Sequence, residues 1–146
     1  MRLLSKSKLV AFRQCPRRLW LEVHRPDLAV VSARLQAVFA TGHQVGDIAR
    51  QLYDRAGQGE MIDLKAEGVP AALARTKQLL QAGKPVFEAG FAAEGGLAFA
   101  DVLLPESGGA WRMVEVKASA SVKDYQREDV AIQSYIARAA GIELAG

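Results

Sequence analysis

The chain is 146 residues long, 50% of its residues are hydrophobic, and its formal net charge is +3. This size and apolar content suffice for one domain with a buried core. No apolar run approaches the ~20 residues that a membrane span requires, and the N-terminus lacks the long apolar stretch of a secretory signal. We therefore expect a soluble, cytoplasmic protein without a membrane partner. The single cysteine, Cys15, excludes an internal disulfide and cannot build a metal site alone.

Basic residues are concentrated at the N-terminal end. Residues 1–25 contain one acid, Glu22, and the basic residues Arg2, Lys6, Lys8, Arg13, Arg17, Arg18 and Arg25. Basic side chains gathered on one element attract phosphate backbones through charge and counterion release, without reading the base sequence. Nucleic acid is therefore a candidate partner of this segment. A solvated helix face explains the same pattern equally well.

The N-terminal part of the chain is expected to form two helices. Ser5 or Ser7 can cap a helix that extends to about Val23 and ends at Arg25-Pro26. Its apolar stripe consists of Leu9, Phe12, Leu19, Trp20 and Val23. A second helix is expected over about 33–55, weakened locally by its two glycines. Its inward-facing residues should be Leu35, Val38, Phe39, Val45, Ala49 and Leu52.

The rest of the chain is expected to combine strands and helices. A short strand over 60–64 and a helix over 71–81 come first. The apolar run 86–91 then begins a three-stranded meander with 97–104 and 111–117, and the turn-rich segment 105–109 connects the last two. A final helix should cover 124–140 and end at Gly141.

Two carboxylates and an ammonium interrupt these apolar strands. Asp101 lies in the second strand of the meander, and Glu115 and Lys117 lie in the third, where alternation places both on one face. Burying such charges is costly unless they pair or bind a cation, and a divalent metal would supply that cation. A strand with one wet face would also place Glu115 and Lys117 in solvent, so the triplet alone does not decide.

The order of several separated motifs is similar to that of a known enzyme superfamily. These motifs are Gly42-His43, Asp101, Glu115-Val116-Lys117 and Gln133-Ser134-Tyr135. They resemble the PD-(D/E)xK nuclease superfamily and, within it, the RecB-like branch, which includes the exonuclease domains of RecB and AddB and the CRISPR adaptation nucleases. Further stretches resemble an uncharacterised bacterial family with an N-terminal RecB-like nuclease domain: Leu4 to Lys8, Cys15 to Pro26, Val122 to Tyr125 and Asp129 to Gln133.

The resemblance implies an α/β fold with a restriction-endonuclease-like core, in which helices flank a mixed sheet centred on an antiparallel three-stranded meander. It implies metal-dependent hydrolysis of DNA phosphodiester bonds in repair, recombination or defence. The implied ligands of Mg²⁺ or Mn²⁺ are His43, Asp101, Glu115 and the carbonyl of Val116. The implied catalytic residues are Asp101, Glu115, Gln133 and Lys117, the last of which would orient the attacking water.

Other residues have looser parallels in the family. Related nucleases carry a Gln-x-x-x-Tyr signature on the last helix, whereas Tyr135 follows Gln133 by only two residues and lies on a different side of that helix. Tyr135 is nevertheless a candidate nucleic-acid-binding residue, together with the basic residues Arg13, Arg17 and Arg18. Glu88 is a candidate additional acidic ligand, with a salt bridge to a surface Lys or Arg as the alternative.

Cys15 raises the question of an iron–sulfur cluster. Some RecB-like nucleases hold such a cluster with one cysteine before the nuclease core and three after it, and Cys15-Pro16 resembles the first. The other three are absent here, although four thiolates are the usual requirement. Either residues 1–146 are a single N-terminal domain whose partner is the C-terminal remainder of the same polypeptide, or the protein has no cluster. The alternative to a nuclease is a catalytically inactive or incomplete nucleic-acid-binding or assembly module.

Overall fold

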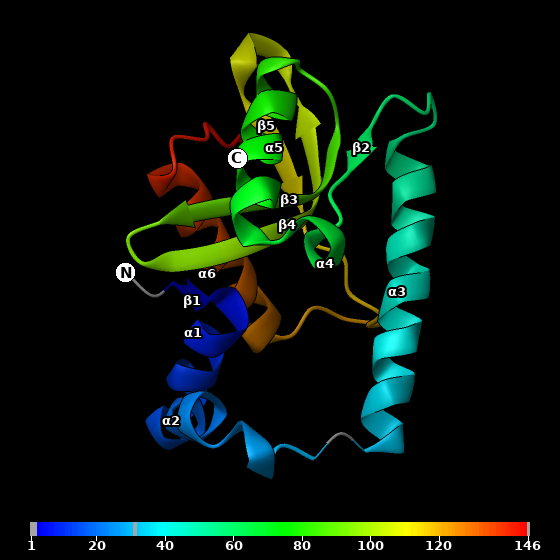
Figure 1. Cartoon of the computed structure of the whole chain (residues 1–146). Coiled ribbons are helices and arrows are strands. Elements are labelled where there is room, and N and C mark those ends of the chain that lie inside the picture. Colours follow the sequence, from blue (N-terminus) through cyan, green and yellow to red (C-terminus); the bar gives the residue numbers. More distant parts are fainter. Residues whose placement is uncertain (1–2, 31, 146) are drawn as a thin grey trace.

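A five-stranded mixed sheet with helices around it forms the framework of the protein (Figure 1). The computed structural model describes residues 3–30 and 32–145, without the side chains of residues 33–35, 38 and 39. The elements in chain order are β1 (Leu4–Ser5), α1 (Lys6–Gln14), α2 (Pro16–His24), η1 (Pro26–Leu28), α3 (Ala33–Tyr53), β2 (Glu60–Met61), α4 (Leu64–Glu67), α5 (Val69–Gln81), β3 (Val86–Ala93), β4 (Gly96–Pro105), η2 (Ser107–Gly109), β5 (Trp111–Val114) and α6 (Asp124–Ala139).

Strand β4 is the centre of the sheet, and its two edges are used differently. Strand β3 runs antiparallel to one edge of β4, with pairs from Val86↔Leu103 to Ala93↔Gly96. Strand β2 extends the sheet beyond β3. The other edge is shared by β1, which is parallel to β4 at residues 96–97, and β5, which is antiparallel to it at residues 102–105. Consequently, β1 and β5 run toward each other, and both end before the middle of β4.

Two apolar clusters hold the helices to the sheet. The larger cluster joins α5 and α6 to β3 and β4, and it includes the fully buried Ala72, Ala89, Ala100 and Leu103. The smaller cluster consists of Phe87, Val102 and Leu104, with Tyr53, Val114 and Val116 packed against it. Tyr53 is the last residue of α3, so this cluster anchors the C-terminal end of the long helix that stands beside the sheet in Figure 1.

The expected single helix at the N-terminus is wrong, because two helices meet at Cys15. Cys15 is extended, with φ −164° and ψ 117°, and Pro16 is at the start of α2. Proline has no N–H to donate and disfavours the helical conformation of the preceding residue, so the chain turns there. The expected apolar stripe is not buried as a whole, since Phe12 and Trp20 are 50% and 55% exposed. None of the residues of α2 is buried.

The long helix α3 has nearly the expected bounds, but its inner face is narrower than expected. Ala49 is buried and Val45 is half-buried, whereas Leu52 is 54% exposed. The side chains of Leu35, Val38 and Phe39 lie outside the described residues. None of the helices in the described part of the chain combines the length and the apolar character needed to cross a membrane.

The remaining elements agree with the expected order and differ in length. Strand β2 has only two residues, because Asp63, two residues after it, caps α4 by accepting hydrogen bonds from the backbone N–H groups of Lys65 and Ala66. Strand β5 ends at Val114 rather than at Lys117. The meander and the final helix are present, so the α/β class and the mixed sheet are confirmed.

A buried threonine connects α5 to β3 and provides a test of this packing. The Thr76 hydroxyl donates to the carbonyl of Ala72 at 2.9 Å and accepts from the N–H of Gly90 at 2.9 Å. Thr76→Val keeps the shape but leaves the Gly90 N–H without this partner, so the free energy of unfolding should fall by about 1–3 kcal/mol. Urea denaturation would measure this loss.

Thr76→Ser is the matched control, because it retains the hydroxyl and removes only a methyl group, at a cost of about 1 kcal/mol. A valine variant that is as stable as the wild type would show that the hydrogen bond to Gly90 does not stabilise this contact.

Candidate functional site

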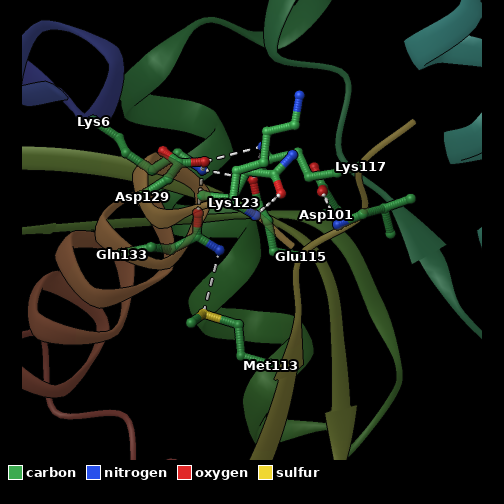
Figure 2. A network of polar contacts seen from close by, with 10 residues as sticks. Lys6, Asp101, Met113, Glu115, Lys117, Lys123, Asp129 and Gln133 are labelled. Carbon is green, nitrogen blue, oxygen red and sulfur yellow. Dashed lines mark hydrogen bonds and ion pairs between the residues drawn. The ribbon is translucent and has the colours of Figure 1, made fainter. Parts of the chain in front are cut away.

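The candidate site lies at the unpaired middle of the β4 edge, where the ends of β1 and β5 meet. Lys6 directly follows β1, and Glu115 directly follows β5. Because these strands approach from opposite directions, the two side chains come together although they are 109 residues apart in the chain. The Nζ atom of Lys6 lies 2.9 Å from Oε1 of Glu115 (Figure 2).

Lys6 and Lys117 share the same two carboxylates. Lys6 lies 3.2 Å from Oδ2 of Asp129, and Lys117 lies 3.0 Å from the same oxygen. Lys117 also contacts Oε1 of Glu115 at 2.5 Å. The four side chains therefore form a ring of alternating charge. Two ammonium groups offset two carboxylates that are almost withdrawn from water, with side-chain exposures of 5% for Glu115 and 14% for Asp129.

Helix α6 supplies Asp129 and, one turn later, Gln133, which is 0% exposed. The Oε1 atom of Gln133 accepts a hydrogen bond from Lys6 at 2.6 Å, and the Nε2 atom of Gln133 donates to the sulfur of Met113 at 3.3 Å. The Met113 contact orients the amide so that its oxygen faces the ammonium. Gln133 therefore contacts the site through Lys6 (Figure 2).

Asp101 fixes the segment that carries Glu115 and Lys117. The pairs Val102↔Val114 and Leu103↔Met113 place Asp101 opposite Glu115 if the register is extended. The ladder stops there, and Oδ2 of Asp101 instead accepts a hydrogen bond from the N–H of Val116 at 2.6 Å. Strand β5 therefore ends early because the carboxylate of Asp101, on β4, takes the place of a backbone carbonyl as the acceptor. Val116 itself packs against the smaller apolar cluster.

Glu88 lies opposite Asp101 on the other edge of β4 and has an unusual backbone. The pairs on either side are Phe87↔Val102 and Ala89↔Ala100, and Glu88 has a φ of 56°. A left-handed conformation at a residue other than glycine costs of order 1–3 kcal/mol and is common at functional sites. It interrupts side-chain alternation, so that Phe87 and Glu88 line the same cleft.

Burial and neighbouring carboxylates raise the pKa values of Glu88 and Asp101. Burial, followed by the charges of Asp101 and Glu115, raises the pKa of Glu88 from 4.5 to about 6. Burial and then Glu115 raise the pKa of Asp101, against the hydrogen bond from Val116. Oε2 of Glu115 is buried and has no hydrogen-bond partner among the described residues. These groups have an unmet demand for positive charge.

The pKa shifts of Lys117 and Asp129, by contrast, favour the charged forms of both groups. Burial by itself lowers the pKa of Lys117, but its contacts with Glu115 and Asp129 outweigh burial and raise it well above the usual range. Burial would raise the pKa of Asp129, whereas Lys6 and Lys117 lower it. Lys117 is therefore a charged ammonium at neutral pH and a hydrogen-bond donor rather than a base.

A cleft of about 560 Å³ separates α3 from the sheet beside this network. Its charged and polar lining residues include His43, Asp47 and Arg50 from α3, Glu88 and Asp101 from the sheet, and Lys117, Lys123 and Tyr125. The structure therefore brings His43 to the same cleft as Asp101 and Lys117. Glu115 does not line this cleft, but it contacts Lys117, which does, and Lys6.

The carboxylate oxygens of this site are chemically suited to a divalent cation, but their arrangement does not give a complete set of ligands. Carboxylate oxygens suit Mg²⁺ and Mn²⁺, and the unpartnered oxygen of Glu115 lies near two acids with raised pKa values. Within residues 3–30 and 32–145, however, no three His, Cys, Asp or Glu side chains are grouped so that they could hold a metal ion. His43, Asp101 and Glu115 therefore do not form a complete set of ligands in this arrangement.

The candidate nucleic-acid-binding residues lie on α1, α2 and α6. Arg13 pairs with Glu128 at 3.3 Å, and Arg18 pairs with Glu22 at 2.8 Å and also bonds to Gln14. Arg17 and Cys15 are exposed. Tyr135 is 63% exposed and lines a different groove, between α1 and α6, so the structure does not bring it to the cleft.

Sequence reasoning missed two residues of the network, Lys6 and Asp129. A weak signal for Asp129 existed, because it precedes Gln133 by four residues and therefore lies on the same helix face. The sequence indicates Lys6 as one of the basic residues and as part of the stretch from Leu4 to Lys8, but not as a residue of the site. Nothing in its local sequence indicates that the end of β1 meets the end of β5.

Comparison of the chain with protein-family models, curated proteins and solved structures gives no match. Its function must therefore be argued from the site itself.

The raised pKa of Glu88 predicts a specific dependence of stability on pH. The folded state holds the Glu88 proton more tightly than the unfolded state, so stability decreases as pH rises from about 4.5 to about 6. Glu88→Gln removes the ionisation. In metal-free buffer it should stabilise the fold at pH 7 by about 1 kcal/mol, after allowance for solvent screening of a partly exposed group, and by little at pH 4.

Glu94→Gln is a matched control, since Glu94 also has a positive φ, of 50°, but is exposed in the turn between β3 and β4. Chemical denaturation of both variants at pH 4 and pH 7 would measure the difference. An equal gain at both pH values for Glu88→Gln would contradict the electrostatic origin of the effect.

Proposed function

We propose that this protein is a metal-dependent phosphodiesterase that hydrolyses DNA, built on a restriction-endonuclease-like core of the RecB-like type. The observation that carries the proposal is the meeting of Asp101, Glu115 and Lys117 at the unpaired edge of β4, beside an open cleft. The buried, unpartnered oxygen of Glu115 supports it further, because a buried carboxylate oxygen with no donor is costly unless a cation contacts it.

In this proposal, Asp101 and Glu115 would hold Mg²⁺ or Mn²⁺, and His43 and the carbonyl of Val116 would be further ligands. The bound ion would supply Lewis acidity at the phosphate and lower the pKa of a bound water. Glu88 would increase the negative potential of the site. Lys117, held as an ammonium by Glu115 and Asp129, would donate a hydrogen bond that orients the attacking water.

The charges around the cleft favour an anionic polymer as the substrate. Apart from Lys117, the basic residues Arg50 and Lys123 line it. Lys6, at the site, is the first residue of α1, and further basic residues, including Arg17, follow it on α1 and α2. A phosphate backbone that followed this path would contact positive charge on both sides of the carboxylates, which supports nucleic acid over a small anionic metabolite.

The second candidate function is a nucleic-acid-binding or assembly module without catalysis. The observation that favours it is that Lys6 and Lys117 already offset the charges of Glu115 and Asp129, so that this pair needs no metal. An iron–sulfur cluster would belong to either function only in a longer polypeptide, because Cys15 would need three further thiolates.

Metal linkage tests the proposal without requiring a substrate. Mn²⁺ that binds only the folded state should stabilise it by ~2.7 kcal/mol at a concentration one hundred times its dissociation constant. Thermal unfolding with Mn²⁺ and with EDTA should therefore differ for the wild type, and the difference should disappear in Asp101→Asn.

Asp27→Asn, in the exposed η1 segment, is the control and should keep the full shift. The same shift in Asp101→Asn as in the wild type would mean that the metal binds elsewhere.

Cleavage of labelled DNA tests catalysis directly. Lys117→Ala should lower the cleavage rate by two or more orders of magnitude, about 3 kcal/mol in activation free energy, because the donor to the water is lost. Its DNA affinity should change little. Assays on single- and double-stranded DNA with Mg²⁺, Mn²⁺ and EDTA would measure this effect.

The contrasting variant is Arg17→Ala/Arg18→Ala. It should weaken binding to all DNA sequences and reduce the salt dependence by about one per lost phosphate contact. If wild type and Lys117→Ala bind DNA but neither cleaves it under any metal condition, the binding module is the better description.

A further inference from the structure

Lys123 occupies an unfavourable position for a cation. It is the N-cap residue of α6, at the positive end of the helix dipole, where serine, threonine, aspartate and asparagine are preferred. Its side chain is exposed, and its ammonium pairs with no carboxylate of the part of the chain that the structure describes. Its backbone is nevertheless fixed, because its N–H donates to Oε1 of Gln126 at 2.9 Å and its carbonyl accepts from the N–H of Gln126 at 3.0 Å. An unpaired cation is therefore held at the wall of the cleft, beside the charged network (Figure 2).

Tyr125, two residues further along the chain, adds an aromatic ring to the same wall. It is 51% exposed and lines the cleft together with Lys123. The segment between β5 and α6, which ends at Lys123, extends toward α3 in Figure 1. An exposed ring beside an unpaired cation is the combination with which proteins hold a nucleic-acid strand, because the ring stacks on a base and the cation contacts a phosphate.

The α3 wall of the cleft offers both space and a hydrogen-bond donor. Gly42 and Gly46 line it one turn apart, and a Cβ atom added to either would meet no described atom within 4 Å. Glycine within a helix is destabilising relative to alanine, and neither residue has the positive φ that would require glycine. A ligand that lies against the backbone of α3 would account for both. Arg50, on the same wall, has a buried Nε donor with no acceptor among the described residues.

The carboxylates of the cleft leave these two walls positive. Glu88 and Asp101 belong to β3 and β4 and so line the side of the sheet. Asp47, on α3, is paired with Arg50 at 2.6 Å. A ligand in the cleft would therefore have the acidic site on one side and the guanidinium of Arg50 and the ammonium of Lys123 on the other two.

We propose that the cleft contains a nucleotide subsite, in which Tyr125 stacks on a base while Lys123 and Arg50 contact the neighbouring phosphates. Such a subsite accepts any base, since every base has a π face and the phosphates are bound through charge alone. The inference rests on the proposed function. It adds how one nucleotide of the strand is held beside Asp101 and Lys117.

Fluorescence anisotropy in EDTA tests stacking without a metal ion and without cleavage of the probe. The probes are a labelled oligothymidylate and an abasic oligomer with the same number of phosphates. Tyr125→Leu should weaken binding of oligothymidylate by at least about fivefold and leave binding of the abasic oligomer unchanged. Tyr125→Phe keeps the ring and should keep both affinities. Phe12→Leu is the matched control, because it removes an exposed ring from the groove between α1 and α6.

The same titrations at several salt concentrations test the phosphate contacts. Lys123→Gln and Arg50→Gln should each weaken binding of both oligomers and reduce the slope of log affinity against log salt by about 0.7, the value for one contact to a single strand. Lys77→Gln, an exposed position on α5, makes the same change in charge as Lys123→Gln and should leave the slope unchanged.

Equal losses for the two oligomers in Tyr125→Leu, or no loss for either, would overturn the stacking. An unchanged salt slope in Lys123→Gln would overturn the phosphate contact. Both results leave the proposed function intact if the wild type cleaves DNA with Mn²⁺. A wild type that binds neither oligomer overturns the subsite, and one that also cleaves no DNA overturns both proposals. If Tyr125→Leu does not fold by circular dichroism, Tyr125→Ser is used with the same expectations.

Discussion

The ion pair between Lys6 and Glu115 is the contact on which the arrangement of this protein depends. The carboxylate of Glu115 is almost fully buried, and a buried charge is costly unless an opposite charge and hydrogen bonds offset it. Lys6 supplies that charge from β1 and α1, while Asp129 and Gln133 bring α6 to the same point. Lys6 therefore joins segments from opposite ends of the chain at one edge of β4, and Lys117 contacts the same two carboxylates.

Two other carboxylates of the site, on β3 and β4, are held less favourably in their charged forms. Glu88 and Asp101 face each other across the sheet register, and both have raised pKa values because burial and neighbouring carboxylates disfavour their charged forms. Glu88 also has a left-handed backbone. Natural sequences usually avoid such conflicts of charge and conformation, and those that remain are concentrated at functional sites. A cation or a cationic ligand in the adjoining cleft would relieve the repulsion.

Apolar spacing and turn residues along the sequence predicted well those elements that bury one continuous face or stripe. The bounds of α3, α5, α6, β3 and β4 followed from apolar periodicity and turn residues, because these elements bury one continuous face or stripe. The break at Pro16 was missed because the apolar spacing continues across it. The early end of β5 was missed because its cause, the carboxylate of Asp101, belongs to another strand.

The sequence by itself determined which residue types could form a charged site, since Asp101, Glu115 and Lys117 stand out against apolar strands. It also determined that Glu115 and Lys117 share a side. Only the tertiary structure decided that Lys6 completes the network, that Asp129 bridges both lysines and that Tyr135 lies away from the cleft. The reason is that these contacts depend on two short strands meeting on one edge of β4, and a contact between side chains 109 residues apart leaves no periodic signal in the chain.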